Sequence, residues 1–171
     1  MKKLFIIAGF LSLTACTNDE GLFTIIDGPV TLEGSWKLTS MLVETPVDIN
    51  GDGISGTDFM IESECYQNET AVFSANLTGQ TQSTSYLEIA VSGSFPDDVT
   101  FTTECVLENE TTDFTWLQNE NTVTVITETG TMTGTLTGNV LTFVIPNGQI
   151  YMDENFEVVL MEDLTMVYTK Q

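Results

Sequence analysis

The chain has no histidine and no arginine, and only four lysines stand against 25 acidic residues, so its net charge at pH 7 is −21. Without histidine, the usual general base, the Ser–His and Cys–His dyads and most zinc and transition-metal sites are excluded. Catalysis would rest on carboxylates alone, and we therefore expect that the protein is not an enzyme. So acidic a surface repels phosphate backbones, which argues against nucleic-acid binding, and it attracts cations.

Long hydrophobic runs are also missing, apart from one at the start of the chain. Leu4–Leu13 is an apolar stretch that follows Lys2 and Lys3, and it is too short to cross a bilayer as a helix. It leads into Leu13-Thr14-Ala15-Cys16, a small residue directly before a cysteine. This arrangement resembles the signal peptide and lipobox of bacterial lipoproteins. The alternative is an ordinary secretory signal, with Cys16 in a disulfide.

The lipobox resemblance implies that residues 1–15 are removed and that Cys16 receives a diacylglyceryl group. Stable anchoring needs more than one acyl chain, as lipoprotein cysteines carry. Residues 16–28 are then a lipidated tether, and the remaining chain has two lysines against 25 acids, a net charge of −23. The Asp19-Glu20 pair resembles the acidic export signals of surface lipoproteins of the Bacteroidetes type. We expect a protein lipid-anchored to the bacterial outer membrane, with the cell surface favoured over the periplasmic face.

Two cysteines remain after Cys16, and an exported protein meets an oxidising compartment. Cys65 and Cys105 are therefore predicted to form a disulfide. It would close a loop of about 40 residues and stabilise the fold by roughly 3–4 kcal/mol in the loop-entropy model. A reactive thiol is the alternative, but neither cysteine has a basic neighbour that would lower its pKa.

The rest of the chain shows the period-two alternation and frequent turn residues of short β-strands. Trp36, Leu38 and Leu42 are predicted to share one face, opposite Met41 and Val43. Asn147-Gly148 is the strongest two-residue hairpin signal, and a last hairpin is predicted to turn at Glu162-Asp163. A short helix is expected near residues 57–62. The residue pattern predicts an all-β domain over 29–171, a single antiparallel meander of about eight to ten strands that closes on itself to hide its edges.

The segment Gly34-Ser35-Trp36-Lys37-Leu38 resembles the opening of lipocalin-like domains found in many lipoproteins of the Bacteroidetes type. The resemblance implies a lipocalin-like β-barrel in which the tryptophan closes one end beneath a basic residue of the last strand. Lys170 is the only basic candidate for that role, so Gly34, Trp36 and Lys170 are the expected barrel-end residues. Candidate ligand-lining residues, which would otherwise fill a solid core, are Leu38, Phe73, Leu87, Ile89, Phe101, Phe143 and Tyr168.

An acidic, glycine-rich loop matches the first half of a calcium-binding loop. Oxygens of Asp48, Asn50 and Asp52 alternate before Gly53, and the Ile54 carbonyl would follow. Position twelve of the pattern is not glutamate, so Asp58 would have to complete the site. A structural calcium ion is the only cofactor that the sequence suggests, and an acidic turn without metal is the alternative.

Two functions are compatible with these observations. The first is a lipid-anchored binding protein of the cell envelope that holds a small hydrophobic ligand in its barrel. The alternative is a surface structural or interaction lipoprotein with a filled barrel, stabilised by calcium and without a small ligand. In both cases we expect a monomer attached to the membrane through Cys16. The volume of the interior distinguishes the two.

Overall fold

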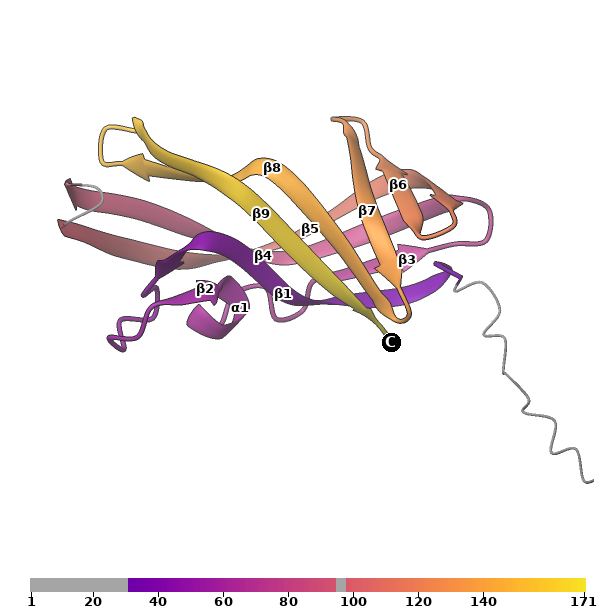
Figure 1. Ribbon diagram of the computed structural model, residues 1–171, viewed down its shortest axis with the longest axis horizontal. Helices are drawn as coiled ribbons and strands as arrows, with labels where there is room; N and C mark the ends of the chain where they lie inside the picture. Colours follow the sequence, from indigo (N-terminus) through magenta and orange to yellow (C-terminus); the bar gives the residue numbers. More distant parts are fainter. Residues whose placement is uncertain (1–30, 95–97) are drawn as a thin grey trace, which may run out of the picture.

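The computed structural model describes residues 31–94 and 98–171, which form nine strands and one helical turn (Figure 1). The strands alternate inward apolar and outward polar residues, as the sequence predicts. Their bounds are β1 Gly34–Val47, β2 Gly56–Asp58, β3 Thr70–Phe73, β4 Thr78–Ser94, β5 Asp98–Asn119, β6 Thr122–Ile126, β7 Thr131–Thr137, β8 Val140–Asp153 and β9 Val158–Lys170; the helical turn α1 is Phe59–Glu62.

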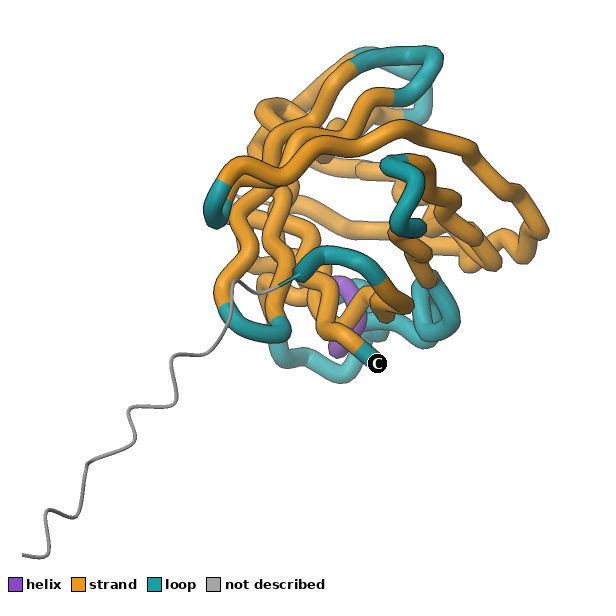
Figure 2. The backbone as a smooth tube through the Cα atoms, turned by 90° about the vertical axis from the view of Figure 1, so that its right-hand side faces the viewer, coloured by secondary structure: helices purple, strands orange, loops and turns teal. Residues whose placement is uncertain are grey.

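Eight of these strands form a closed antiparallel β-barrel. The order is β1-β3-β4-β5-β6-β7-β8-β9, and β9 pairs back with β1, so the first and last strands close the barrel. Strand β2 is an additional strand that pairs with the second half of β1. Figure 2 shows the strands arranged around the interior. The predicted all-β meander with barrel closure is confirmed.

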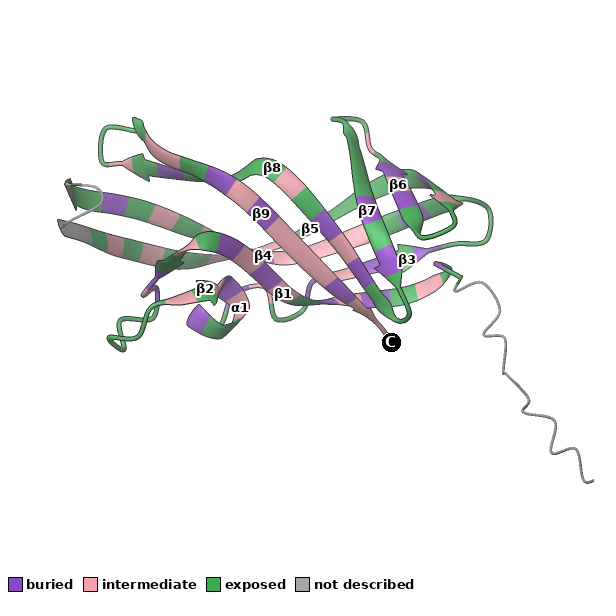
Figure 3. Cartoon of the chain, in the orientation of Figure 1, coloured by how far each residue is buried: buried purple, intermediate pink, exposed green. Residues whose placement is uncertain are grey.

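The core lies inside this ring. Burial alternates along the strands, which gives the striped pattern in Figure 3. Aromatic rings fill much of the space: Phe73 lies 5.0 Å from Phe114 and 5.9 Å from Trp116, measured between ring centroids. On β8 and β9, Phe143 contacts Tyr168 edge to face, with their ring centroids 6.4 Å apart. Such tilted and edge-to-face pairs are favourable arrangements for aromatic packing.

Two long hairpins, β4–β5 and β8–β9, extend beyond the barrel. The ends of β4 and β8 and the starts of β5 and β9 lie at the end of the molecule opposite the start of β1 and the C-terminus (Figure 1). We call the end that holds Trp36 and Lys170 the proximal end, and the end where β4 and β8 finish the distal end. Near the distal end the hairpins are joined by a short parallel pairing of β4 with β8, in which Ala90 faces Met152 and Val91 faces Asp153.

The predicted faces of β1 are correct only for its first half. Trp36 and Leu38 are buried, but so are Met41 and Val43, whereas Leu42 is half-buried. The register between β1 and β9 shifts between Leu38 and Ser40. An irregularity of this kind moves every later side chain to the other face, and strict alternation cannot anticipate it.

The two predicted hairpins near the C-terminus are wrong. Asn147-Gly148 lies inside β8, where the register with β9 is irregular between Ile145 and Gln149. The Asn147 backbone has a φ of 52°, and its N–H donates to Oδ1 of Asp163 at 3.0 Å. Glu162-Asp163 lies within the continuous strand β9. The chain turns instead at residues 154–157, between β8 and β9.

The short helix expected near residues 57–62 exists as the single turn α1. Asp58 caps it, because Oδ1 of its side chain accepts the Met60 N–H at 3.0 Å. The same carboxylate accepts the Ser40 hydroxyl at 2.6 Å and the Met41 N–H at 3.0 Å. Asp58 therefore fastens α1 to β1.

Candidate functional site

The three residues expected at the barrel end do meet at the proximal end. Trp36 is fully buried, and the Lys170 ammonium lies 5.6 Å from the centre of its ring. Gly34 has a φ of +126°, and a Cβ there would lie 3.1 Å from the Lys170 side chain, so glycine leaves the room that the lysine needs. Lys170 Nζ also donates to the Thr31 carbonyl at 2.7 Å, and Trp36 Nε1 donates to the Leu32 carbonyl at 2.8 Å.

The cavity found inside the barrel is small. An apolar cavity of about 40 Å³ lies among side chains of the barrel, whereas pockets for small ligands are roughly 300–1,000 Å³. Three of the seven predicted lining residues contribute to it, namely Phe73, Phe143 and Tyr168. All seven belong to the buried core or pack against it: Leu38, Phe73, Leu87, Ile89, Phe101, Phe143 and Tyr168. The predicted residues face inward, but they fill the barrel.

Three buried glutamates were not recognised in the sequence. At Glu69, Oε1 accepts the N–H groups of Thr84 and Ser85 at 2.9 and 3.1 Å, where the register of β4 with β5 shifts. At Glu162, Oε1 accepts the Tyr151 hydroxyl and Oε2 accepts the Thr45 N–H, both at 2.8 Å. The third is Glu62, whose Oε2 accepts the Ile49 N–H at 3.4 Å. These carboxylates hold backbone segments in place where regular strand pairing is interrupted.

The tyrosines around these groups are hard to ionise. Burial raises the pKa of Tyr151 above its ordinary value, and the hydrogen bond to Glu162 raises it further. Burial also raises the pKa of Tyr168, to which the charge of Glu69 adds. Both phenols are therefore neutral at physiological pH, and they serve packing and hydrogen bonding rather than proton transfer.

The calcium-loop residues are divided between two places. Asp48 accepts the N–H groups of Gly51 and Gly53, each at 2.9 Å, and Asn50 accepts the Asp52 N–H at 2.9 Å. The Asp58 carboxylate instead accepts hydrogen bonds from β1 and α1, as described above. Among residues 31–94 and 98–171, no group of three or more His, Cys, Asp or Glu side chains is placed to hold a metal ion. Calcium binding by Asp48, Asn50, Asp52, Ile54 and Asp58 stays a prediction.

The disulfide between Cys65 and Cys105 is present, with the two Cα atoms 5.7 Å apart. It joins the segment after α1 to β5. Cys65 is fully buried, while Cys105 lies on the surface. Cys16, the signal peptide 1–15 and the tether 16–28 lie outside the described residues.

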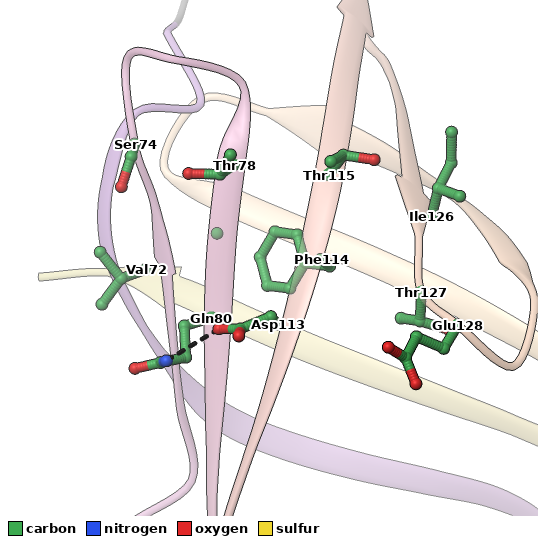
Figure 4. Close-up of a pocket in the computed structure, with 11 residues that line it drawn as sticks. Val72, Ser74, Thr78, Gln80, Asp113, Phe114, Thr115, Ile126, Thr127 and Glu128 are labelled. Atoms are coloured by element: carbon green, nitrogen blue, oxygen red, sulfur yellow. Dashed lines mark hydrogen bonds between the residues drawn. The ribbon is translucent and has the colours of Figure 1, made fainter.

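The outer surface, in contrast to the interior, carries open grooves. One of about 850 Å³ crosses the outward face of β3, β4 and β5 and reaches the turn after β6 (Figure 4). Val72 and Ile126 are its exposed apolar side chains, and Gln80 Nε2 donates to Oδ1 of Asp113 at 2.9 Å. Ser74, Thr78, Thr115 and Thr127 add hydroxyl groups to a lining that also contains apolar surface.

A second groove, of about 500 Å³, lies at the distal end. It is formed where β4, β5 and β8 meet, and we call it the distal groove.

Comparison with known proteins gives no lead. No protein-family model, curated protein or solved structure matches the chain. In the part of the chain that the structure describes, helices long and apolar enough to span a membrane are absent.

Proposed function

We propose that the protein is a lipid-anchored protein of the bacterial cell envelope that binds its partner on the outer surface of a filled β-barrel. The observation that carries this proposal is the contrast between the 40 Å³ cavity in the barrel and the outer grooves of about 850 and 500 Å³. A small molecule of ordinary size does not fit the interior. The barrel then acts as a rigid support, and the surfaces that it displays do the binding.

The anchoring part of the proposal rests on the leader and on the position of the first described residues. The basic residues, the apolar run and Cys16 form the pattern of a lipoprotein signal. Thr31 lies against Lys170 at the proximal end, so a tether enters the fold there. The absence of histidine, noted above, favours binding over catalysis.

A second candidate is storage of a small hydrophobic ligand in the barrel. It is favoured by the presence of Met132 and Met166 in the lining of the 40 Å³ cavity. Methionine side chains are flexible and adapt to irregular spaces, so they provide a way to enlarge the cavity. A ligand would nevertheless have to displace several core side chains, which costs packing energy.

Mass spectrometry of the full-length protein, purified from bacterial membranes in mild detergent, tests both parts. Under denaturing conditions we expect the mass of a chain that begins at Cys16 and carries acyl groups; an intact N-terminus without added mass would refute the anchor. Under native conditions we expect the protein without a retained apolar ligand. A ligand present in equimolar amount would refute the filled barrel and support the second candidate.

A cavity-forming variant provides the matched control. Phe143→Ala removes a buried ring beside the existing cavity and should admit a small apolar molecule such as benzene, whose binding should raise the melting temperature of the variant. Benzene should leave the melting temperature of the parent protein unchanged. An equal rise in the parent protein would contradict a filled interior.

A further inference from the structure

The distal groove exists because small and large side chains meet where the two long hairpins join. Ala90 on β4 is the cross-strand partner of Thr102 on β5 and of Met152 on β8. Its single methyl group leaves a depression between these neighbours. Ile150, Met152 and Phe156 supply the apolar wall, and their exposed fractions are 41%, 36% and 85%.

Carboxylates surround this apolar wall. Glu88 and Glu104 are direct cross-strand partners on β4 and β5, an arrangement of like charges that weakens a sheet. Asp153 lies at the end of β8, and its pKa is lowered by hydrogen bonds from the N–H groups of Glu157 and Asn155. The groove therefore presents three acidic side chains around apolar groups.

No lysine of the described residues neutralises these charges. Lys37 and Lys170 both lie on the proximal parts of β1 and β9, where Lys37 pairs with Thr169 and Lys170 pairs with Trp36. The distal end thus carries uncompensated negative charge. Because exposed negative charge attracts positively charged ligands, the groove is complementary to a cationic partner.

Phe156 is held at the edge of the groove by the turn between β8 and β9. Oδ1 of Asp153 accepts the N–H groups of Asn155 and Glu157, each at 2.8 Å, and the Phe156 N–H donates to the Asp153 carbonyl. Phe156 has a φ of 62°, in the left-handed region that glycine and asparagine adopt at lower cost. The turn itself does not need an aromatic residue there. An exposed ring on a fixed turn is instead suited to contact with a partner.

We propose that the distal groove binds a basic segment of a partner protein, in which lysine or arginine side chains alternate with apolar ones. The carboxylates of Glu88, Glu104 and Asp153 receive the cationic groups, and the wall formed by Ile150, Met152 and Phe156 receives the apolar side chains. A second copy of this chain does not fit, because two chains that each carry a net charge of −21 repel one another. This inference rests on the proposed outer-surface function and names the site and the chemistry of its partner.

The test measures binding of a short fluorescent peptide of alternating lysine and valine to the intact protein at low salt, by fluorescence anisotropy. Replacing lysine by glutamate, or valine by serine, provides two control peptides. We expect binding of the Lys/Val peptide, weaker binding of the Lys/Ser peptide and none of the Glu/Val peptide. Equal binding of the Lys/Val and Lys/Ser peptides would overturn the apolar half of the proposal.

Variants of the protein separate the groove from general electrostatic attraction. Glu88→Gln/Glu104→Gln should raise the Kd about fivefold or more, whereas Glu33→Gln/Glu120→Gln removes the same charge from exposed positions outside both grooves and should change the Kd less than twofold. Phe156→Ser should raise the Kd about tenfold, and Leu107→Ser, at a side chain that is 82% exposed, should not. Equal effects of both glutamate pairs would overturn the site. Tight binding of spermine, unaffected by Phe156→Ser, would instead assign the groove to small polyamines.

These outcomes are independent of the experiment on the barrel interior. If native mass spectrometry shows a ligand in the barrel, the outer-surface function fails whatever the peptide does. If the interior is empty of ligand and the distal variants bind the peptide like the parent protein, only the distal site fails.

Discussion

Lys170 and Trp36 are direct cross-strand partners on β9 and β1, and the lysine ammonium lies over the tryptophan ring at 5.6 Å from its centre. The pair joins the two strands that close the barrel. It brings the last strand, the first strand and the segment at Thr31 into one contact. A cation over an indole ring is favourable by about 0.5–2 kcal/mol.

Lys170→Gln should therefore lower the free energy of unfolding by about 1–2 kcal/mol, because it removes both the cation over the ring and a charged hydrogen-bond donor. Lys170→Arg should preserve most of the stability. Lys37→Gln is the matched control, and its effect should stay within about 0.5 kcal/mol. Urea unfolding followed by tryptophan fluorescence measures all three. A Lys170→Gln variant as stable as the parent would show that the contact does not stabilise the closure.

Glu162 should be the most sensitive acidic residue of the distal half. Glu162→Ala leaves the Tyr151 hydroxyl and the Thr45 N–H without their acceptor in a buried region, and we expect a loss of about 2–4 kcal/mol. Glu162→Gln keeps one carbonyl oxygen and should lose less. Glu154→Gln, in an exposed turn, should be neutral. Denaturation midpoints of the three variants give the comparison, and equal midpoints for Glu162→Ala and Glu154→Gln would contradict the assignment.

The buried tyrosines predict loss of stability at alkaline pH. The pKa values of Tyr151 and Tyr168 are raised in the folded state, so below about pH 10 both states keep the phenolic proton and stability is constant. Above about pH 10 the unfolded chain releases these protons while the folded one retains them, which favours unfolding. The urea midpoint should fall above about pH 10, and less steeply in Tyr151→Phe/Tyr168→Phe. Identical slopes would mean that other groups cause the fall.

Reduction of the Cys65–Cys105 disulfide should destabilise the fold strongly. The bond closes a loop of 40 residues, which corresponds to about 4 kcal/mol in the loop-entropy model. For a domain of this size, the melting temperature should fall by roughly 10 °C. Dithiothreitol should have no effect on Cys65→Ser/Cys105→Ser, which should already melt at the lower temperature. A reductant effect on that variant would point to another cause.

The calcium prediction can be tested by chelation. If Asp48, Asn50 and Asp52 hold an ion, ethylenediaminetetraacetate should lower the melting temperature of the mature domain, and added calcium should restore it. Asp52→Ala should abolish the difference, whereas Asp113→Ala, on the barrel surface, should not. An unchanged melting temperature with chelator would leave the loop as an acidic turn held by its own side-chain hydrogen bonds.

Local patterns were sufficient for the fold class. Alternation in β6 and β8, with Val123 and Val125 or Leu141 and Phe143 inward, requires only that one face of a sheet be buried. The contact of Lys170 with Trp36 could be expected because no other basic residue is available near the end of the chain. The structure places the Lys170 ammonium over the Trp36 ring.

Strand boundaries and irregularities could not be predicted in the same way. Asn147-Gly148 fits a hairpin turn, but the Asn147 N–H donates to Asp163 and the strand continues. A contact with a residue 16 positions away in the sequence therefore determines the local structure. The pair Glu162-Asp163 is typical of a solvated turn, but Glu162 shares the period-two spacing of buried Leu164, and that spacing is the signal in the sequence that indicates burial. The distal groove depends on the pairing of Ala90 with Met152, which no local pattern contains.

Closure of the barrel by its first and last strands also constrains biosynthesis. Until the 13 residues of β9 have left the ribosome, β1 and β8 each lack a neighbour that they have in the finished fold. A nascent chain therefore cannot complete its core early. Its sheet keeps two unpaired edges, and stable folding waits until β9 has been released.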